Sequence, residues 1–182
     1  MAEKQENKPD RYAAIIEHFL KRIKTDGTFR AAFKSADNAD MEHRCWEYLA
    51  LFYGVDIESR KARRPYAAVL AAVARNKDIS ADGKQGLGDA LLSALSASGY
   101  DSESPAARMR LRRILACADM EELCSVLRPV LNYISSKGAD ISYGRLLKEI
   151  IWFEKDAESI KARWAGQFFS AKKDNQEDNQ DI

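Results

Sequence analysis

The scarcity of glycine and proline is the feature that most restricts how this chain can fold. Its 182 residues include nine glycines and four prolines, about 7% of the sequence, against a usual share of about 12%. Alanine and leucine contribute 27 and 15 residues, whereas isoleucine, valine and threonine together contribute 19. Small and unbranched side chains favour helix, and β-branched ones favour strand. The composition therefore excludes a β-sandwich and a doubly wound sheet, and we predict an all-α protein.

Apolar spacing and capping residues predict about nine helices in two small helical bundles. In the last helix, Trp164 and Phe168 lie one turn apart and are predicted to anchor it in the core. Pro129 is expected to kink its helix or to start it anew. The predicted helices span residues 11–24, 28–34, 41–53, 65–76, 89–98, 105–117 and 120–137, followed by one that Asp140 or Ser142 opens and one that Asp156 opens.

A polar segment at residues 100–104 is the best candidate for a boundary between the two bundles. We therefore predict an N-terminal bundle over residues 10–100 and a C-terminal bundle over residues 101–171. The polar residues 1–9 and the acidic residues 172–182 carry too few apolar side chains to pack, so we expect both ends to be disordered.

Several features predict a soluble cytoplasmic protein without a membrane partner. The longest apolar run, residues 66–74, has nine residues, whereas about 20 are needed to span a bilayer. The first ten residues contain no apolar stretch typical of a signal peptide. Three cysteines are an odd and sparse set, as expected of thiols kept reduced in the cytosol.

The sequence contains no constellation that indicates catalysis. The glycines of residues 83–88 match neither GxxxxGK[ST] nor GxGxxG, so they predict a turn and not a nucleotide loop. His18 and His43 fall on different predicted helices, and Cys117 and Cys124 lack the further ligands of a zinc site. We interpret the two cysteines as buried thiols. We expect no metal, no cofactor, no small-molecule substrate and no enzymatic activity.

Basic residues gather in three segments, although the net charge is only +1. Residues 21–34 contain five cations and one acid, residues 59–77 contain six cations and no acid, and residues 104–118 contain four arginines and no acid. Arginine presents a planar fork to phosphate oxygens, and neutralised phosphates supply most of non-specific nucleic-acid affinity. No base-reading motif accompanies the clusters. They therefore indicate binding to a nucleic-acid backbone without sequence preference.

Helical spacing divides the four arginines of residues 105–117 between two edges of one helix. Arg108 and Arg112 are four residues apart and share one edge, and Arg110 and Arg113 are three apart and share another. All four are predicted to face solvent, since a small core cannot take them. The apolar residues predicted to turn inward are Leu111, Ile114 and Leu115.

Two C-terminal segments resemble one family of CRISPR proteins. Residues 106–134 (AARMRLRRILACADMEELCSVLRPVLNYI) resemble the arginine-rich helix, capped turn and long helix of CasB, the small subunit of the type I-E complex Cascade. Residues 141–169 (ISYGRLLKEIIWFEKDAESIKARWAGQFF) are similar to its closing pattern, which ends in a QxRWAxxFY-like helix. Residues 27–36 and 83–95 resemble its earlier segments more loosely. The departures are Gly86 where the family has serine, Lys161 where it has glutamine, and the interrupting Pro129.

The resemblance implies a non-catalytic helical subunit that acts in antiviral defence. Such a subunit binds guide RNA and target DNA within Cascade, stabilises the R-loop and the displaced strand, and contacts the Cascade backbone and large subunits and a second copy of itself. By position, the resemblance implies that the nucleic-acid-binding residues are Arg30, Lys34, Arg60, Lys61, Arg64, Lys84, Arg108, Arg110, Arg112, Arg113 and Arg128.

Two other interpretations compete with this one. A helical adaptor could use the same basic faces to dock acidic protein partners. A small all-α hydrolase would need a metal or nucleophile constellation that the sequence lacks.

Overall fold

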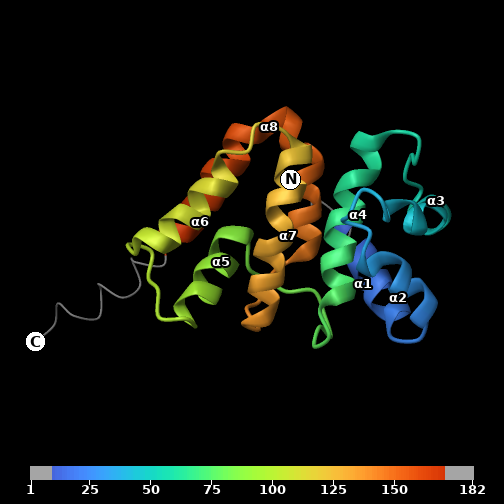
Figure 1. The fold of residues 1–182 in the computed structure, drawn as a ribbon, viewed down its shortest axis with the longest axis horizontal. Helices are drawn as coiled ribbons and strands as arrows, with labels where there is room; N and C mark the ends of the chain where they lie inside the picture. The colour runs from blue at the N-terminus through green and yellow to red at the C-terminus, as the bar shows by residue number, and fades with distance from the viewer. Residues whose placement is uncertain (1–9, 171–182) are drawn as a thin grey trace, which may run out of the picture.

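The computed structural model describes residues 10–170 and is helical throughout, which confirms the predicted fold class (Figure 1). Within these residues it contains eight α-helices, one short 3-10 helix and no β-strand. The expectations for residues 1–9 and 172–182 lie outside the described residues. The elements are α1 (Arg11–Ile23), α2 (Gly27–Lys34), η1 (Glu42–Cys45), α3 (Trp46–Tyr53), α4 (Arg60–Arg75), α5 (Leu87–Ser96), α6 (Pro105–Leu115), α7 (Met120–Ser136) and α8 (Tyr143–Ser170).

Side chains that accept hydrogen bonds from free backbone N–H groups explain where several helices begin. Asp10 Oδ1 accepts from Tyr12 N at 3.1 Å in α1, and Asp26 Oδ1 accepts from Phe29 N at 2.8 Å in α2. At the start of α7, Asp119 Oδ1 accepts from Glu122 N at 2.8 Å. The carboxylate of Glu122 accepts from the N–H of Ala118, the residue before the cap, so Asp119 and Glu122 form an arrangement like a capping box.

Two N-terminal helices differ from their predicted form. The helix expected over residues 41–53 begins as the 3-10 helix η1 and becomes α-helical only at Trp46. Phe52 of this helix is 39% exposed. Helix α4 begins at Arg60 and not near Pro65, because the Ser59 hydroxyl accepts from the N–H of Ala62.

Interruptions are predicted for the two C-terminal helices, at Pro129 in α7 and at Asp156 in α8. Helix α7 is one helix from Met120 to Ser136, so the prediction that Pro129 starts a new helix is wrong. Pro129 and Ser125 are both exposed, so water can reach the Ser125 carbonyl, for which proline provides no N–H. Helix α8 contains a bend at Asp156, where φ is −145° and ψ is 40°. The sequence predicts a helix start at this position.

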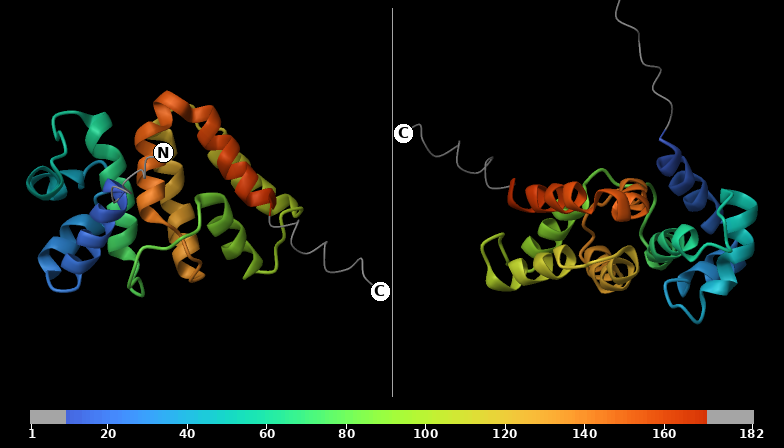
Figure 2. Two further views of the ribbon diagram at one scale, coloured as in Figure 1. Left: turned by 180° about the vertical axis from the view of Figure 1, so that it is seen from behind. Right: turned by 90° about the horizontal axis from the view of Figure 1, so that it is seen from above.

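The helices form two groups joined by α7 and α8. Helices α1 to α4 gather at one end, and α5, α6 and the C-terminal segment of α8 lie at the other (Figure 1, Figure 2). Helix α8 packs against α1, α4 and α5, so it contacts both groups. Helix α5 precedes the predicted boundary near residue 100 and packs against α6, α7 and α8. The boundary itself stays a prediction.

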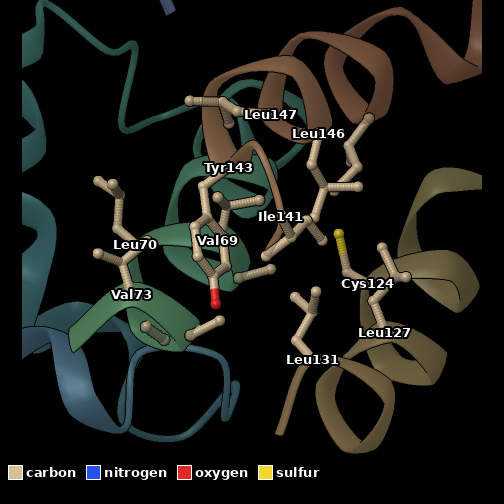
Figure 3. Close-up of a cluster of buried hydrophobic side chains, with 14 of the residues drawn as sticks. Val69, Leu70, Val73, Cys124, Leu127, Leu131, Ile141, Tyr143, Leu146 and Leu147 are labelled. Atoms are coloured by element: carbon tan, nitrogen blue, oxygen red, sulfur yellow. The ribbon is translucent and has the colours of Figure 1, made fainter. Parts of the chain in front are cut away.

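The buried side chains of both groups form one continuous core. Figure 3 shows part of it, where Val69 and Val73 of α4 lie on one side and Leu127 and Leu131 of α7 on the other, with Tyr143 of α8 between the helices. All of residues 66–74 are buried, because α1, α2, α7 and α8 surround α4. Trp164 and Phe168 have no exposed surface, which confirms that they anchor the last helix.

The turn at residues 83–88 is a packing junction against the end of α8. A Cβ atom at Gly86 would collide with the side-chain amide of Gln167. The carbonyl of that amide accepts from Gly88 N at 3.0 Å. Gln167 therefore supplies the helix cap for α5 that a serine at position 86 would otherwise provide.

The histidine, cysteine and acidic side chains of residues 10–170 do not gather into a metal site. No group of three or more histidine, cysteine or acidic side chains there is arranged to hold a metal ion. Cys45, Cys117 and Cys124 are free and buried, as predicted for the last two. Burial raises the pKa of Cys45 and of Cys124 to about 12. These two thiols are therefore protonated at neutral pH. In the same residues, no helix has the length and apolar character that a membrane crossing requires.

Candidate nucleic-acid interface

The four arginines of helix α6 reach solvent and form few hydrogen bonds or ion pairs with other groups. Arg110, Arg112 and Arg113 are exposed, whereas Arg108 is half-buried and its Nε donates to the carbonyl of Ser102 at 3.1 Å. Within residues 10–170 none of the four forms an ion pair with a carboxylate. Leu111 and Ile114 are buried as predicted, and Leu115 is partly buried.

The four arginines line two different grooves, as their spacing predicts. Arg110 and Arg113 form the α7-facing edge, and the Arg110 guanidinium lies 4.4 Å from the centre of the Tyr133 ring. Arg108 and Arg112 form the α8-facing edge, beside Phe169 at the end of α8. The floor of the first groove consists of Leu91, Val126, Pro129, Val130 and Tyr133, and that of the second consists of Leu111, Leu115 and Phe169.

Arginines from two helices meet around one buried carboxylate, and we call these residues, together with the adjacent Lys34, the Asp37 cluster. Asp37 Oδ2 lies 2.7 Å from Arg75 Nη1 of α4 and 3.3 Å from Arg128 Nε of α7. Arg75 Nη1 also donates to the carbonyl of Lys34 at 3.0 Å, and Lys34 of α2 is exposed. The side chain of Asp37 is only 2% exposed. The cluster therefore carries three positive charges and one negative charge.

The exposed stripe of α7 connects the Asp37 cluster to the α7-facing edge of α6. Arg128 and Asn132 bond to the cluster, and Pro129 lines the groove beside Arg110 and Arg113. Helix α7 has no acidic residue after Glu122. Helices α6 and α7 lie together at the front in Figure 1, with α8 behind them. We define the α6–α7 surface as the basic residues Lys34, Arg75, Arg128, Arg110 and Arg113.

Two residues of the predicted set, Arg64 and Arg30, use their guanidinium groups for hydrogen bonds within the fold. Arg64 is 4% exposed, and it donates to Glu42 Oε2 at 3.3 Å and to the Asp37 carbonyl at 2.8 Å. The nucleic-acid contact expected of Arg64 stays a prediction, and in this structure its guanidinium is held by partners within the fold. Arg30 donates to the carbonyls of Ala74 at 2.9 Å and Asn76 at 3.2 Å, so it caps the C-terminus of α4.

The remaining three predicted residues are exposed but lie outside the α6–α7 surface. Arg60 forms a bidentate pair with Glu121 at 2.7 and 3.0 Å, and this hydrogen bonding lowers the pKa of Glu121. Lys61 pairs with Glu154 at 2.8 Å. Lys84 is exposed in the turn before α5.

Arg75 is the residue of the α6–α7 surface that the predicted set omits. It lies in the acid-free segment 59–77, which the sequence alone identifies as basic. Its pairing with Asp37 depends on a contact between residues 38 positions apart, which no local pattern reveals.

A third groove with basic residues lies at the bend of α8, and its charges cancel. Arg163 and Arg145 pair with the buried carboxylate of Glu149 at 3.0 and 3.4 Å. Trp152 is 47% exposed at the same place. The groove is lined by Asp10, Arg145, Lys148, Glu149, Trp152, Asp156, Ile160 and Arg163. Three cations face three acids, so this groove offers an anion less attraction than the α6–α7 surface does.

Known proteins match this chain in both sequence and fold. Residues 29–169 match the family model of CRISPR-associated protein Cse2. A comparison with curated proteins found no match. A chain of a solved "CRISPR RNA-guided surveillance complex" is similar at 18% identity and a TM-score of 0.74, with coverage of 93% of this chain and 97% of that chain.

Two solved CasB proteins show the same fold. CasB from M. ruber is similar at 18% identity and a TM-score of 0.70, with coverage of 95% of this chain and 100% of that chain. CasB from Thermus thermophilus is similar at 20% identity and a TM-score of 0.65, with coverage of 87% and 97%. The family match spans most of the chain and agrees with the CasB resemblance of its sequence, so this protein belongs to the CasB/Cse2 family of CRISPR-associated proteins.

Proposed function

We propose that this chain is the non-catalytic small subunit of a type I-E CRISPR Cascade complex and that its α6–α7 surface binds nucleic-acid backbone. Membership of the family and the shared fold with a chain of an RNA-guided surveillance complex support the first part. In this role the subunit stabilises the R-loop between guide RNA and target DNA, together with the displaced strand. Its partners are the Cascade backbone and large subunits and a second copy of itself.

The observation that carries the nucleic-acid assignment is the charge of the α6–α7 surface. Five cations converge there from four helices, and the acid among them, Asp37, is buried. Arg110 and Arg113 have no carboxylate partner in the described part of the chain, so their guanidinium forks can take phosphate oxygens without first breaking an ion pair. Binding of this kind follows the phosphate backbone, while guide and target pairing supplies the sequence specificity.

A charge-reversal variant tests the proposal. Arg110→Glu combined with Arg113→Glu is introduced into the chain, and Cascade is reconstituted with guide RNA. We expect at least a 10-fold loss of target-DNA affinity at physiological salt and unchanged assembly with guide RNA. For the isolated chain, the slope of log affinity against log salt should fall by roughly 0.7–0.9 for each phosphate that the variant no longer neutralises.

The matched control reverses two exposed cations outside the surface. Lys21→Glu combined with Lys155→Glu changes the net charge by the same amount and should alter DNA affinity less than twofold. Equal DNA binding by the two double variants and the native chain would show that the α6–α7 surface does not contact nucleic acid. Loss of assembly with intact DNA affinity would instead support the adaptor interpretation.

A further inference from the structure

The α8-facing edge of α6 is a basic surface that the proposed interface leaves unused. Arg108 and Arg112 line a groove whose floor is Leu111, Leu115 and Phe169. Neither arginine pairs with a carboxylate among residues 10–170, and Phe169 is 45% exposed. The edge therefore combines two available guanidinium groups with apolar surface, at the point where α8 ends.

The chain that follows α8 has the opposite charge. After Phe169 the sequence reads SAKKDNQEDNQDI, and residues 174–181 contain four acids and no base. The acids are Asp174, Glu177, Asp178 and Asp181. The only other charged residues in this stretch are Lys172 and Lys173, which precede the acids.

The acidic residues are close enough in sequence to reach the edge. Asp174 and Asp178 follow Phe169 by five and nine residues, which span at most about 17 and 30 Å of extended chain. Helix α6 has 11 residues and is therefore about 16 Å long. Because Phe169 already lines the groove with Arg108 and Arg112, the whole α8-facing edge lies within this range.

We propose that residues 174–181 of this chain occupy the α8-facing edge and pair their carboxylates with Arg108 and Arg112. Charge complementarity favours this occupant, and its attachment beside the groove gives it a local concentration of about 1 mM or more. If the proposed function holds, these carboxylates compete with phosphate for the positive charge of α6, because four acids at one edge reduce the attraction of Arg110 and Arg113 at the other. They then weaken the binding of stray nucleic acid.

The contact is tested in the full chain without any nucleic acid. A nitroxide spin label is attached at the Gln180→Cys position, and the native chain treated in parallel shows any labelling of the three buried cysteines. We expect the NMR amide signals of Leu111 and Arg112 to lose more than half their intensity at low salt. Because exposed charges are screened within about 3 Å at 1 M salt, the signals should recover as salt is raised toward that concentration.

Matched variants identify the groups that make the contact. Neutralising the four acids with isosteric amides (Asp174→Asn, Glu177→Gln, Asp178→Asn and Asp181→Asn) should abolish this broadening of the amide signals by the spin label. Arg108→Glu with Arg112→Glu should abolish it as well. Arg110→Glu with Arg113→Glu should retain it. Broadening that is absent in the native sequence, or equally strong after the acids are neutralised, would overturn the proposal.

Competition with nucleic acid is measured with a fluorescein-labelled, mixed-sequence single-stranded DNA of 20 nucleotides. At low salt we expect the amide-substituted chain to bind this probe several-fold more tightly than the native chain. The same substitution in the Arg108→Glu, Arg112→Glu background should change the affinity less than twofold. Unchanged affinity despite a detected contact would overturn the competition. If no form of the chain binds the probe, the proposed function fails, and the spin-label experiment still decides the contact.

Discussion

Replacing Gly88 with alanine tests the close crossing of α5 and α8. Gly88 is buried in the first turn of α5, and its N–H donates to Gln167 Oε1 at 3.0 Å. A Cβ atom there would collide with the Trp164 carbonyl and would approach Gln167 Cβ to 2.8 Å and Phe168 N to 2.9 Å. Two of these three atoms belong to the backbone of α8, so no side-chain rotation relieves the collision and the helices must separate.

The structure sets the expected size of the effect. Overpacking a close-packed contact costs about 1–3 kcal/mol, and weakening the hydrogen bond to Gln167 costs about 1 kcal/mol more. The gain in helix propensity from glycine to alanine is at most about 1 kcal/mol. The net loss in the free energy of unfolding is therefore about 1–3 kcal/mol. For a protein of this size it corresponds to a fall in Tm of roughly 2–12 °C.

Gly166→Ala is the matched control, because it makes the same chemical change in open space. A Cβ at Gly166 meets no atom within 4 Å, and the residue lies inside α8. We expect this variant to be more stable than the native chain by up to about 1 kcal/mol. Urea unfolding followed by circular dichroism measures both variants. A Gly88→Ala protein as stable as the native chain, or a shift of the same sign in both variants, would refute the reasoning.

Other substitutions test the core and its charged groups. Trp164→Ala should lower the free energy of unfolding by about 3–5 kcal/mol, since it empties a fully buried site; an unchanged Tm would contradict this. Asp37→Asn should lower it by about 1–3 kcal/mol, because two arginines lose their common carboxylate; urea unfolding at matched salt measures the difference. Arg60 holds the pKa of Glu121 below its ordinary value. The pair therefore stabilises the fold above the ordinary carboxyl pKa and loses that contribution as the pH falls, so native stability should drop more steeply on acidification than that of Glu121→Gln. The three buried thiols should react with a maleimide only slowly in the native state and readily in urea; rapid native labelling would contradict their burial.

Local chemistry determined the helical character of the chain and most helix starts. Asp10, Asp26 and Asp119 act on N–H groups two or three residues away, so their capping roles follow from neighbouring sequence. The division of the α6 arginines between two edges follows equally directly from 3.6 residues per turn. At Pro129 local reasoning left two outcomes, a kink or a new helix, and the helix continues because one missing hydrogen bond on an exposed helix face does not outweigh the packing of α7 on the core.

Only the tertiary structure decided which cations are available to a ligand. Arg60 and Arg64 belong to the same basic run, yet Arg60 is exposed and Arg64 is buried against Glu42. Arg75 and Arg128 meet at Asp37 although each is far from it in sequence. A charge pattern records which residues are basic. Whether a guanidinium faces solvent, caps a helix or pairs with a carboxylate depends on which helices pack together, because ion pairs and burial are contacts between residues distant in the chain.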